Sequence, residues 1–314
     1  MGTPEFARQP FAYLCQSRHE TVAIVTGRDK PIGRGHRLLP TACHQEADSR
    51  HIRVFMPRSL KDEQLYQDLK ALDPDIFVVV AFRILPERLF TLPRYGSVNV
   101  HASLLPKYRG AAPIHWALIN GERETGLTSF FLRPTVDTGD IIHQQKVPIY
   151  DNDNYDSLSA RLSAASGPFL LETLDMIEDG RMTPIPQNDA EATPAPKLTP
   201  FDGLIDWGLP AENVRNFVRG LATKPGAYTY FRGGKVKVFE CALSPQDDIP
   251  GTRPGTILPS KRRLLVSCGR STVEVLRLVP EGKKEMDGRS FINGFRPESG
   301  ELFGEISQGV RNHE

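Results

Sequence analysis

Short apolar runs alternate with helical patterns along the first half of the chain. Helical spacing of apolar residues is found in SLKDEQLYQDLKAL (59–72) and APIHWALINGE (112–122). Strand-like runs rich in Val, Ile and Phe are TVAIVTG (21–27), DIFVVVAF (75–82), GSVNVHA (96–102) and GLTSFFL (126–132). Continuous apolar strands between helices are typical of a parallel sheet covered on both faces. The pattern predicts a doubly wound α/β domain over residues 1–184.

A change of pattern follows near residue 180. The stretch DGRMTPIPQNDAEATPAPKLTP (179–200) is rich in Pro, Thr and acidic residues and has no sustained period, which favours an interdomain linker over 185–203. After a helical segment at 211–221, short apolar runs separated by glycines fill the rest of the chain. This spacing predicts a small β-barrel over residues 204–310.

Composition and charge narrow the possible functions. With 39% hydrophobic and 25% charged residues among 314, the chain has the composition of a folded globular protein. Its formal net charge of +1 excludes a globally basic nucleic-acid binder, so any nucleic-acid contact must be local. Four scattered cysteines and no apolar run long enough to cross a bilayer lead us to expect a cytoplasmic protein that does not bind a membrane.

Two polar residues interrupt the strand-like run at 96–102. Asn99 and His101 lie two residues apart, so they point to the same face of a strand, at its carboxyl end. Ligands of open α/β sheets bind at this end. A third polar group, Asp137, stands in the turn DTGD. Each has a simple structural explanation, since strand ends often carry satisfied polar groups and Asp is common in turns.

Taken together, an amide, an imidazole and a carboxylate suit acyl transfer to a nucleophile that carries its own lone pair. The amide and imidazole can donate hydrogen bonds to a developing oxyanion, and the carboxylate can support the imidazole and relay a proton. No G-x-S-x-G motif surrounds Ser103, which disfavours a serine hydrolase.

NVHASLLPKYRGAAPIHWALINGERETGLTSFF (99–131) followed by DTGDII (137–142) resembles the signature of the folate-dependent formyltransferases. The resemblance also includes MGTPEFA (1–7), DKPIGRGHRLLP (29–40), GLIDW (203–207) and PGTI (254–257). It implies a first domain that binds 10-formyltetrahydrofolate and a second, OB-like barrel that helps to hold tRNA. The implied reaction transfers the formyl group to the α-amino group of methionyl initiator tRNA, without a metal, in a protein that we expect to be a monomer.

The same resemblance implies roles for individual residues. Asn99, His101 and Asp137 would be catalytic. The basic loop at 27–40 would enter the acceptor end of the tRNA. Folate would contact Phe82, Arg83, Ile84, Leu85, Ser103, Leu104, Leu105, Pro106 and Asp140. On the basic loop the residues that bind tRNA would be Arg28, Lys30, Arg34 and Arg37. In the expected barrel, Lys235 and Lys237 could contact phosphates, because OB-like barrels often bind nucleic acid.

The chain departs from the family in two places. Members of the family carry an apolar strand directly before the MGTPEFA motif, which here stands at residues 1–7, so we expect the sheet of this chain to lack its first strand. AFRILP (81–86) is one residue shorter than the common form of that segment. Two alternatives stay open: a formyltransferase for a small amine, such as a nucleotide sugar or glycinamide ribonucleotide, and a folate- or RNA-binding protein without catalysis. A small acceptor would need neither the basic loop nor the barrel.

Overall fold

The chain forms two compact units, which are described separately. The computed structural model describes residues 1–32, 37–244, 251–258, 260 and 262–304, with main chain only at 30–32 and 37. The first unit comprises Met1–Pro113, Glu124–Pro148 and Leu158–Pro196, and the second comprises Ile114–Arg123, Ile149–Ser157 and the chain from Lys197 onward. The predicted linker at 185–203 is therefore divided, because residues 185–196 cluster with the first unit.

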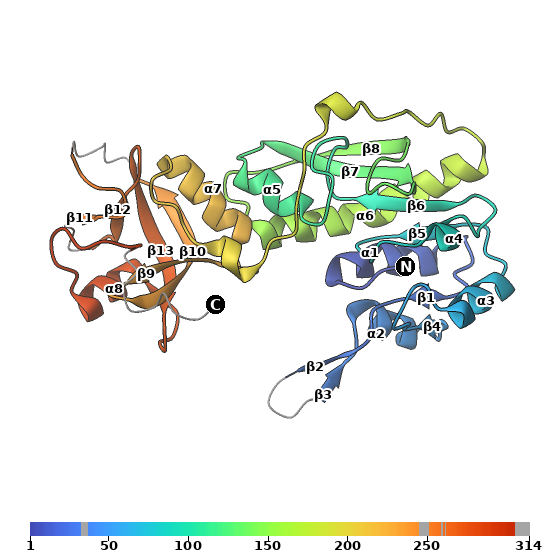
Figure 1. Ribbon diagram of the computed structural model, residues 1–314, viewed down its shortest axis with the longest axis horizontal. Helices are drawn as coiled ribbons and strands as arrows, with labels where there is room; N and C mark the ends of the chain where they lie inside the picture. The colour runs from blue at the N-terminus through green and yellow to red at the C-terminus, as the bar shows by residue number, and fades with distance from the viewer. Residues whose placement is uncertain (33–36, 245–250, 259, 261, 305–314) are drawn as a thin grey trace. The chain divides into compact units, whose positions relative to one another are not determined.

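The first unit is an α/β structure with helices on both faces of its strands (Figure 1). Its central sheet has the order β5-β6-β7-β8. Strands β5 and β6 are parallel, whereas β6–β7 and β7–β8 are antiparallel. The strands of the sheet are β5 (Phe77–Val79), β6 (Ser97–His101), β7 (Glu124–Phe131) and β8 (Ile141–Pro148). A parallel pair and a hairpin complete the strands: β1 (Ile24–Val25) with β4 (Val54–Phe55), and β2 (Lys30–Ile32) with β3 (Arg37–Leu39).

The helices cover the sheet because alternate strand residues point to opposite faces. Phe77 and Val79 of β5 pack with Leu65 and Leu69. On the other face, Val98 of β6 packs with Ile177. The helices are α1 (Glu5–Gln16), α2 (Ala42–Ser49), α3 (Glu63–Ala71), α4 (Glu87–Phe90) and α6 (Tyr155–Glu178), most of which lies in this unit. A short helix, η1 (Asp189–Glu191), follows in the segment that ends at Pro196.

An open slot separates β1 from β5. Residues Met1 and Gly2 fill only its end, where the Gly2 N–H donates to the Val25 carbonyl and the Val80 N–H donates to the Met1 carbonyl. Gly2 also forms a parallel bridge with Val80. A cavity of about 410 Å³ lined by Ile24, Val25, Phe77 and Val78, among others, continues from this point. Met1 lies at the end of this slot. The resemblance predicts a further strand at the sequence position directly before residues 1–7.

The second unit is built on one curled antiparallel sheet that forms a half-barrel. The strand order is β11-β12-β13-β10-β9, and β14 pairs with β13. Register shifts near Val238 and Glu240 mark a bulge in β10, which bends the sheet. The strands are β9 (Ala227–Phe231), β10 (Gly234–Leu243), β11 (Ile257–Leu258), β12 (Leu265–Ser267), β13 (Thr272–Pro280) and β14 (Met286–Asp287). The helices are α5 (Pro113–Ile119), η2 (Pro200–Gly203), α7 (Ala211–Leu221) and α8 (Gly288–Phe295).

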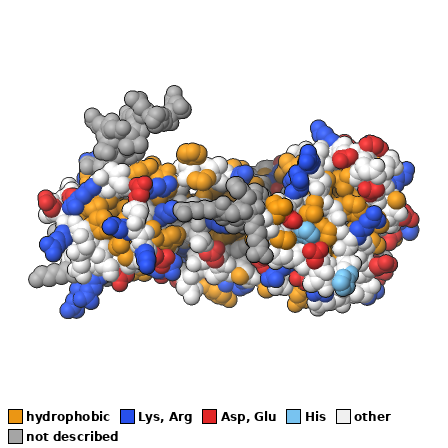
Figure 2. All heavy atoms as spheres, turned by 90° about the horizontal axis from the view of Figure 1, so that it is seen from below, with side chains coloured by type: hydrophobic (Ala, Val, Ile, Leu, Met, Phe, Trp, Pro, Cys, Tyr) orange, Lys and Arg blue, Asp and Glu red, His pale blue; other side chains and the backbone are white. Residues whose placement is uncertain are grey.

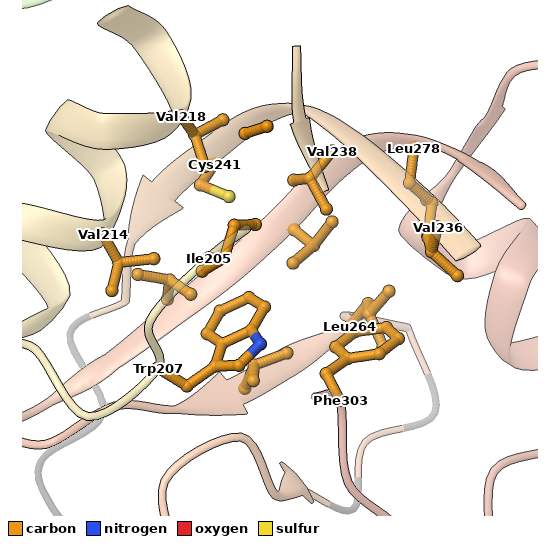
Figure 3. Packing of buried hydrophobic residues seen from close by; sticks show 14 of the residues in the cluster. Ile205, Trp207, Val214, Val218, Val236, Val238, Cys241, Leu264, Leu278 and Phe303 are labelled. Atoms are coloured by element: carbon orange, nitrogen blue, oxygen red, sulfur yellow. The ribbon is translucent and has the colours of Figure 1, made fainter. Parts of the chain in front are cut away.

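The core of the second unit is rich in large apolar side chains. Figure 3 shows Trp207, Leu264 and Phe303 beside valines of α7 and β10. The indole N–H of Trp207 donates to Thr229 Oγ1 at 3.0 Å, so its one polar atom is satisfied in the core. The two units confirm the predicted fold class, an α/β domain followed by a small β domain. None of the described helices combines the length and apolarity needed to cross a membrane.

The slot between β1 and β5 leads to a prediction about stability. We expect a fused segment of four residues such as Val-Ile-Val-Val, placed directly before Met1, to pair with both strands and raise the midpoint of thermal unfolding by several degrees. Each Val or Ile side chain that becomes buried contributes about 1.5–3 kcal/mol before entropic costs. The measurement is calorimetry of the 314-residue chain with and without the segment.

The gain should also depend on pH. Burial lowers the pKa of the Met1 amino group to about 6 from its usual 8.0, so the unextended fold loses stability as pH falls from 8 toward 6, where only the unfolded chain readily takes up the proton. The extension replaces this amine by an amide, so its benefit should be larger at pH 6 than at pH 8. A Gly-Ser-Gly-Ser extension is the matched control. Equal unfolding midpoints for the two extensions at both pH values would contradict the prediction that the apolar segment fills the slot between β1 and β5.

Candidate active site

His101 is fixed at the end of β6 by a hydrogen bond through one ring nitrogen. Its side chain is buried, and Nε2 lies 2.8 Å from the carbonyl oxygen of Tyr108. A carbonyl can only accept, so Nε2 carries the proton and donates it. The other nitrogen, Nδ1, lies 3.7 Å from Oδ2 of Asp137. The structure thus brings together two residues that are distant in sequence, with Nδ1 as the ring nitrogen that faces the carboxylate.

Asp137 occupies a tight turn between β7 and β8. Its φ of 55° is in the left-handed region, which costs a residue with a Cβ. Its carboxylate is buried and accepts the N–H of Gly110 at 2.8 Å. Two residues later, a Cβ on Gly139 would lie 1.6 Å from the Phe131 carbonyl oxygen, so only glycine fits there. The turn therefore requires Gly139, and it places the Asp137 carboxylate where it is available for chemistry.

Asn99 shares the face of β6 that carries His101. It is half-buried and lies beside Val79 of β5 and Phe130 of β7 in the sheet register. Within the described part of the chain, its side-chain amide makes no hydrogen bond. The amide can therefore donate to a bound group without first breaking a contact inside the protein.

The SLLP loop after β6 is held from beneath by two strand residues. Thr128 Oγ1 donates to the Ser103 carbonyl at 2.6 Å and accepts the Leu105 N–H at 3.1 Å. Gln144 Nε2 donates to the Leu105 carbonyl and to Thr128 Oγ1, both at 2.9 Å. Ser103 is fully buried, and its hydroxyl donates to the Lys107 carbonyl at 2.7 Å. The Ser103 side chain therefore shapes the loop, while Leu104 and Pro106 are partly exposed along it and Leu105 is buried.

The remaining residues predicted to contact folate are the segment 82–85 and Asp140, and their surroundings differ. Phe82 and Leu85 pack into the apolar cluster under α3 and α4, whereas Ile84 is 74% exposed. The Arg83 guanidinium donates to the carbonyls of Pro57 and Arg58 at 3.2 and 3.3 Å. Asp140 forms an ion pair with Arg133 at 2.6 Å.

The residues predicted to bind tRNA lie in both units. Arg28 is exposed in the first unit, Lys30 and Arg37 lie on the β2–β3 hairpin, and Arg34 is outside the described residues. In the second unit, Lys235 and Lys237 alternate with two buried valines and so share one face of β10. The Lys235 ammonium lies 3.6 Å from the ring centre of Tyr228. On the face drawn in Figure 2, lysines and arginines lie among acidic and apolar side chains, as the net charge suggests.

Residues 185–196 contribute to this site, although their composition favours a linker. This stretch pairs with the chain around Arg109 through main-chain hydrogen bonds to Thr193 and Ala195, and the Gln187 side chain contacts the turn at Asp137. The one local signal is Gln187, whose amide can both donate and accept hydrogen bonds. A single glutamine among prolines and acidic residues is also typical of a linker, so the sequence does not predict its role.

The support beneath the SLLP loop can be tested by removing one hydroxyl. Thr128→Val keeps the shape of the side chain but leaves the Ser103 carbonyl and the Leu105 N–H without this partner. We expect the free energy of unfolding to fall by about 1–3 kcal/mol, measured by urea denaturation.

Thr125→Val, on the same strand, is the matched control. Thr125 is also buried, but its hydroxyl has no hydrogen-bond partner among the described residues. This change should be neutral or stabilising, because it removes an unsatisfied polar atom. Equal destabilisation by the two substitutions would show that the hydrogen bonds of Thr128 do not matter.

Known protein families match most of this chain. The Formyl transferase family matches residues 1–174, and the family described as Formyl transferase, C-terminal domain, matches residues 197–296. A methionyl-tRNA formyltransferase of Caldanaerobacter subterraneus subsp. tengcongensis is 40% identical over 296 residues, which cover 94% of this chain and 95% of that relative. One of Geobacter sulfurreducens is 39% identical over 97% of this chain and 96% of its own length.

Solved structures show the same fold at lower identity. The sugar 3N-formyl transferase WlaRD is 15% identical, with a TM-score of 0.63 over 90% of this chain and 97% of that one. An N-formyltransferase from Helicobacter canadensis is 18% identical, with a TM-score of 0.62 over 87% of this chain and 96% of that one. The family matches to both units and the full-length relatives agree, and the chain belongs to the formyl transferase family.

Proposed function

We propose that this chain transfers the formyl group of 10-formyltetrahydrofolate to the α-amino group of methionyl initiator tRNA. The observation that carries the proposal is the anchored imidazole of His101, with Nε2 bound to the Tyr108 carbonyl and Nδ1 directed at the buried Asp137 carboxylate. The full-length relatives at 39% and 40% identity act on methionyl-tRNA according to their names. Both of these relatives match this chain over more than nine tenths of its length, so the match includes the second unit.

The residues around Asn99 fit a folate formyl donor. The formyl oxygen requires hydrogen-bond donors, and the Asn99 amide is unused among the described residues. A flat pterin ring requires apolar surface, and two apolar side chains in the segments assigned to folate and to the Asp137 turn, Ile84 and Val136, are 74% and 46% exposed. We assign folate contacts to Phe82–Leu85, Ser103–Pro106 and Asp140, with Ser103 acting through its main chain. The donor supplies an activated formyl group.

Asn99, His101 and Asp137 then have separate roles in the transfer. The neutral α-amine forms a C–N bond with the formyl carbon, and the bond to the folate nitrogen breaks. The Asn99 amide and the His101 imidazole stabilise the oxygen that becomes negative. Asp137 supports the imidazole and accepts the amine proton through water. The proton then passes from Asp137 to the folate nitrogen.

The domains divide the work between donor and acceptor. We propose residues 1–184 as the catalytic domain, 185–203 as the connection and 204–310 as the domain that binds tRNA. Arg28, Lys30, Arg34 and Arg37 would meet the acceptor end, with Lys235 and Lys237 on the backbone. A monomer in the cytoplasm, with no metal, suffices for this chemistry.

The catalytic assignment predicts a loss of rate in His101→Ala. We expect kcat to fall about a hundredfold, equivalent to about 3 kcal/mol, because one donor to the oxyanion is removed. The assay quantifies formylmethionine from 10-formyltetrahydrofolate with methionyl initiator tRNA, and methionyl elongator tRNA in parallel. His51→Asn, which changes an exposed histidine with φ of 57° to a residue that tolerates this conformation, should keep the full rate. An unchanged kcat for His101→Ala at saturating substrates would refute the mechanism.

Activity of the unchanged chain separates the alternatives. Formylation of the initiator tRNA alone supports the proposal, whereas formylation of a nucleotide sugar or glycinamide ribonucleotide instead would favour a small acceptor. Binding of folate without turnover of any acceptor would favour a non-catalytic role.

The tRNA assignment predicts a change in salt dependence. In the double variant Lys235→Ala, Lys237→Ala, the slope of log affinity for tRNA against log salt should decrease in magnitude by about 1 for each phosphate that is no longer neutralised. Fluorescence anisotropy of labelled tRNA at several salt concentrations provides the measurement. Lys146→Ala removes a lysine that is exposed and paired with Glu124, and it should leave the slope unchanged. An unchanged slope in the double variant would remove these two lysines from the interface.

A further inference from the structure

The segment 187–195 forms an added edge beside the loop that follows β6. The Arg109 N–H donates to the Thr193 carbonyl at 2.9 Å, and the Ala195 N–H donates to the Arg109 carbonyl at 2.6 Å. The Ala112 N–H donates to the Ala195 carbonyl at 3.1 Å, and the Tyr108 N–H donates to Thr193 Oγ1 at 2.9 Å. These bonds fix the main chain of residues 108–112, which supplies both the carbonyl that holds His101 and the N–H that holds Asp137.

The Gln187 carboxamide joins this loop to the turn at Asp137. Its Nε2 donates to the carbonyls of Asp137 and Gly139, at 2.9 and 2.8 Å. Its Oε1 accepts from Nε and Nη2 of Arg109, at 3.0 and 2.8 Å. All four hydrogen-bonding positions of the amide are used, and the partners determine its orientation because carbonyls only accept and a guanidinium only donates.

Arg109 is itself held in place. Its side chain is only 16% exposed, and Nη2 forms an ion pair with Asp189 at 2.7 Å. The next residue along, Gly110, donates its N–H to Asp137 Oδ2. The loop at 108–112 thus binds the Asp137 carboxylate, and Gln187 binds the Asp137 carbonyl. The same loop binds Gln187 through Arg109. The contacts form a closed ring.

Such a ring is what the conformation of Asp137 requires. A left-handed φ at a residue with a Cβ, such as the 55° of Asp137, is strained and persists when surrounding contacts impose it. A relaxed turn would move the carboxylate away from His101 Nδ1, now 3.7 Å distant. We propose that Gln187 is a positioning residue for the reaction, because it locks the Asp137 turn to the loop that anchors His101. This inference rests on the proposed function.

Two substitutions at Gln187 test the proposal. Gln187→Met keeps the length of the side chain but removes all four hydrogen bonds, so we expect kcat to fall roughly 10- to 100-fold, with KM for either substrate changed less than about threefold. Gln187→Glu keeps acceptors for Arg109 but loses both donors to the Asp137 and Gly139 carbonyls, so it should be as slow as the Met variant. A Glu variant with the original kcat would overturn the proposal, because contact with Arg109 alone would then suffice.

A double-mutant cycle with Asp137→Asn shows whether Gln187 acts through Asp137. If it does, Gln187→Met should reduce kcat less than about threefold when Asp137 is already Asn. Equal losses in both backgrounds would indicate general structural damage and refute the positioning role. If Asp137→Asn alone leaves kcat unchanged, the proposed function fails at Asp137. If Asp137→Asn is slow but Gln187→Met is not, only the present inference fails.

The adjacent residue provides the matched control. Among the described residues, the Asn188 side chain hydrogen-bonds to Ala190 and Glu191 within its own turn, so Asn188→Ala should keep the original kcat. All variants are compared below their unfolding midpoints. If Gln187→Met does not fold, Arg109→Lys takes its place, because an ammonium cannot reproduce the two-pronged contact with Oε1. The same pattern of reduced kcat and retained KM is expected, and an unchanged kcat would refute the proposal.

Discussion

The buried contact between His101 and Asp137 is the constraint on which the first unit depends. The two residues come from a strand end and a turn that are distant in sequence, and main-chain groups of the loop at 108–110 bind both side chains. A polar pair buried in this way is costly unless its remaining positions are satisfied. The loop, the turn and the segment after α6 therefore have to be built together, and the apolar sheet beneath them provides the rigid base.

The sequence was sufficient for the parts of the site that local geometry determines. The two-residue period of a strand places Asn99 and His101 on one face, and the glycine in DTGD indicates a tight turn. Alternation of strands and helices gave the fold class. This alternation does not predict that β7 and β8 pair in antiparallel fashion, because an apolar run reads the same in a parallel and an antiparallel strand.

Contacts across long stretches of sequence were beyond local patterns. Residues 185–196 have the composition of a linker, yet they pair with residues 108–112, far earlier in the chain. Ser103 illustrates a subtler limit: its type and position fit a ligand contact, but its hydroxyl is used by the Lys107 carbonyl. In both cases the partner is a main-chain group, which any residue can present and which therefore leaves no trace in the sequence.

The chemistry of Gln187 explains why an amide suits the turn better than a charged side chain. A lysine at this position could donate to the Asp137 and Gly139 carbonyls, but its charge would also attract the nearby carboxylate and compete with His101. A carboxylate would repel both carbonyls. The neutral amide holds the main chain and leaves the Asp137 carboxylate facing the imidazole, while Asp189 offsets the positive charge of Arg109 on the outer side. The support is thus electrically neutral where a proton has to move.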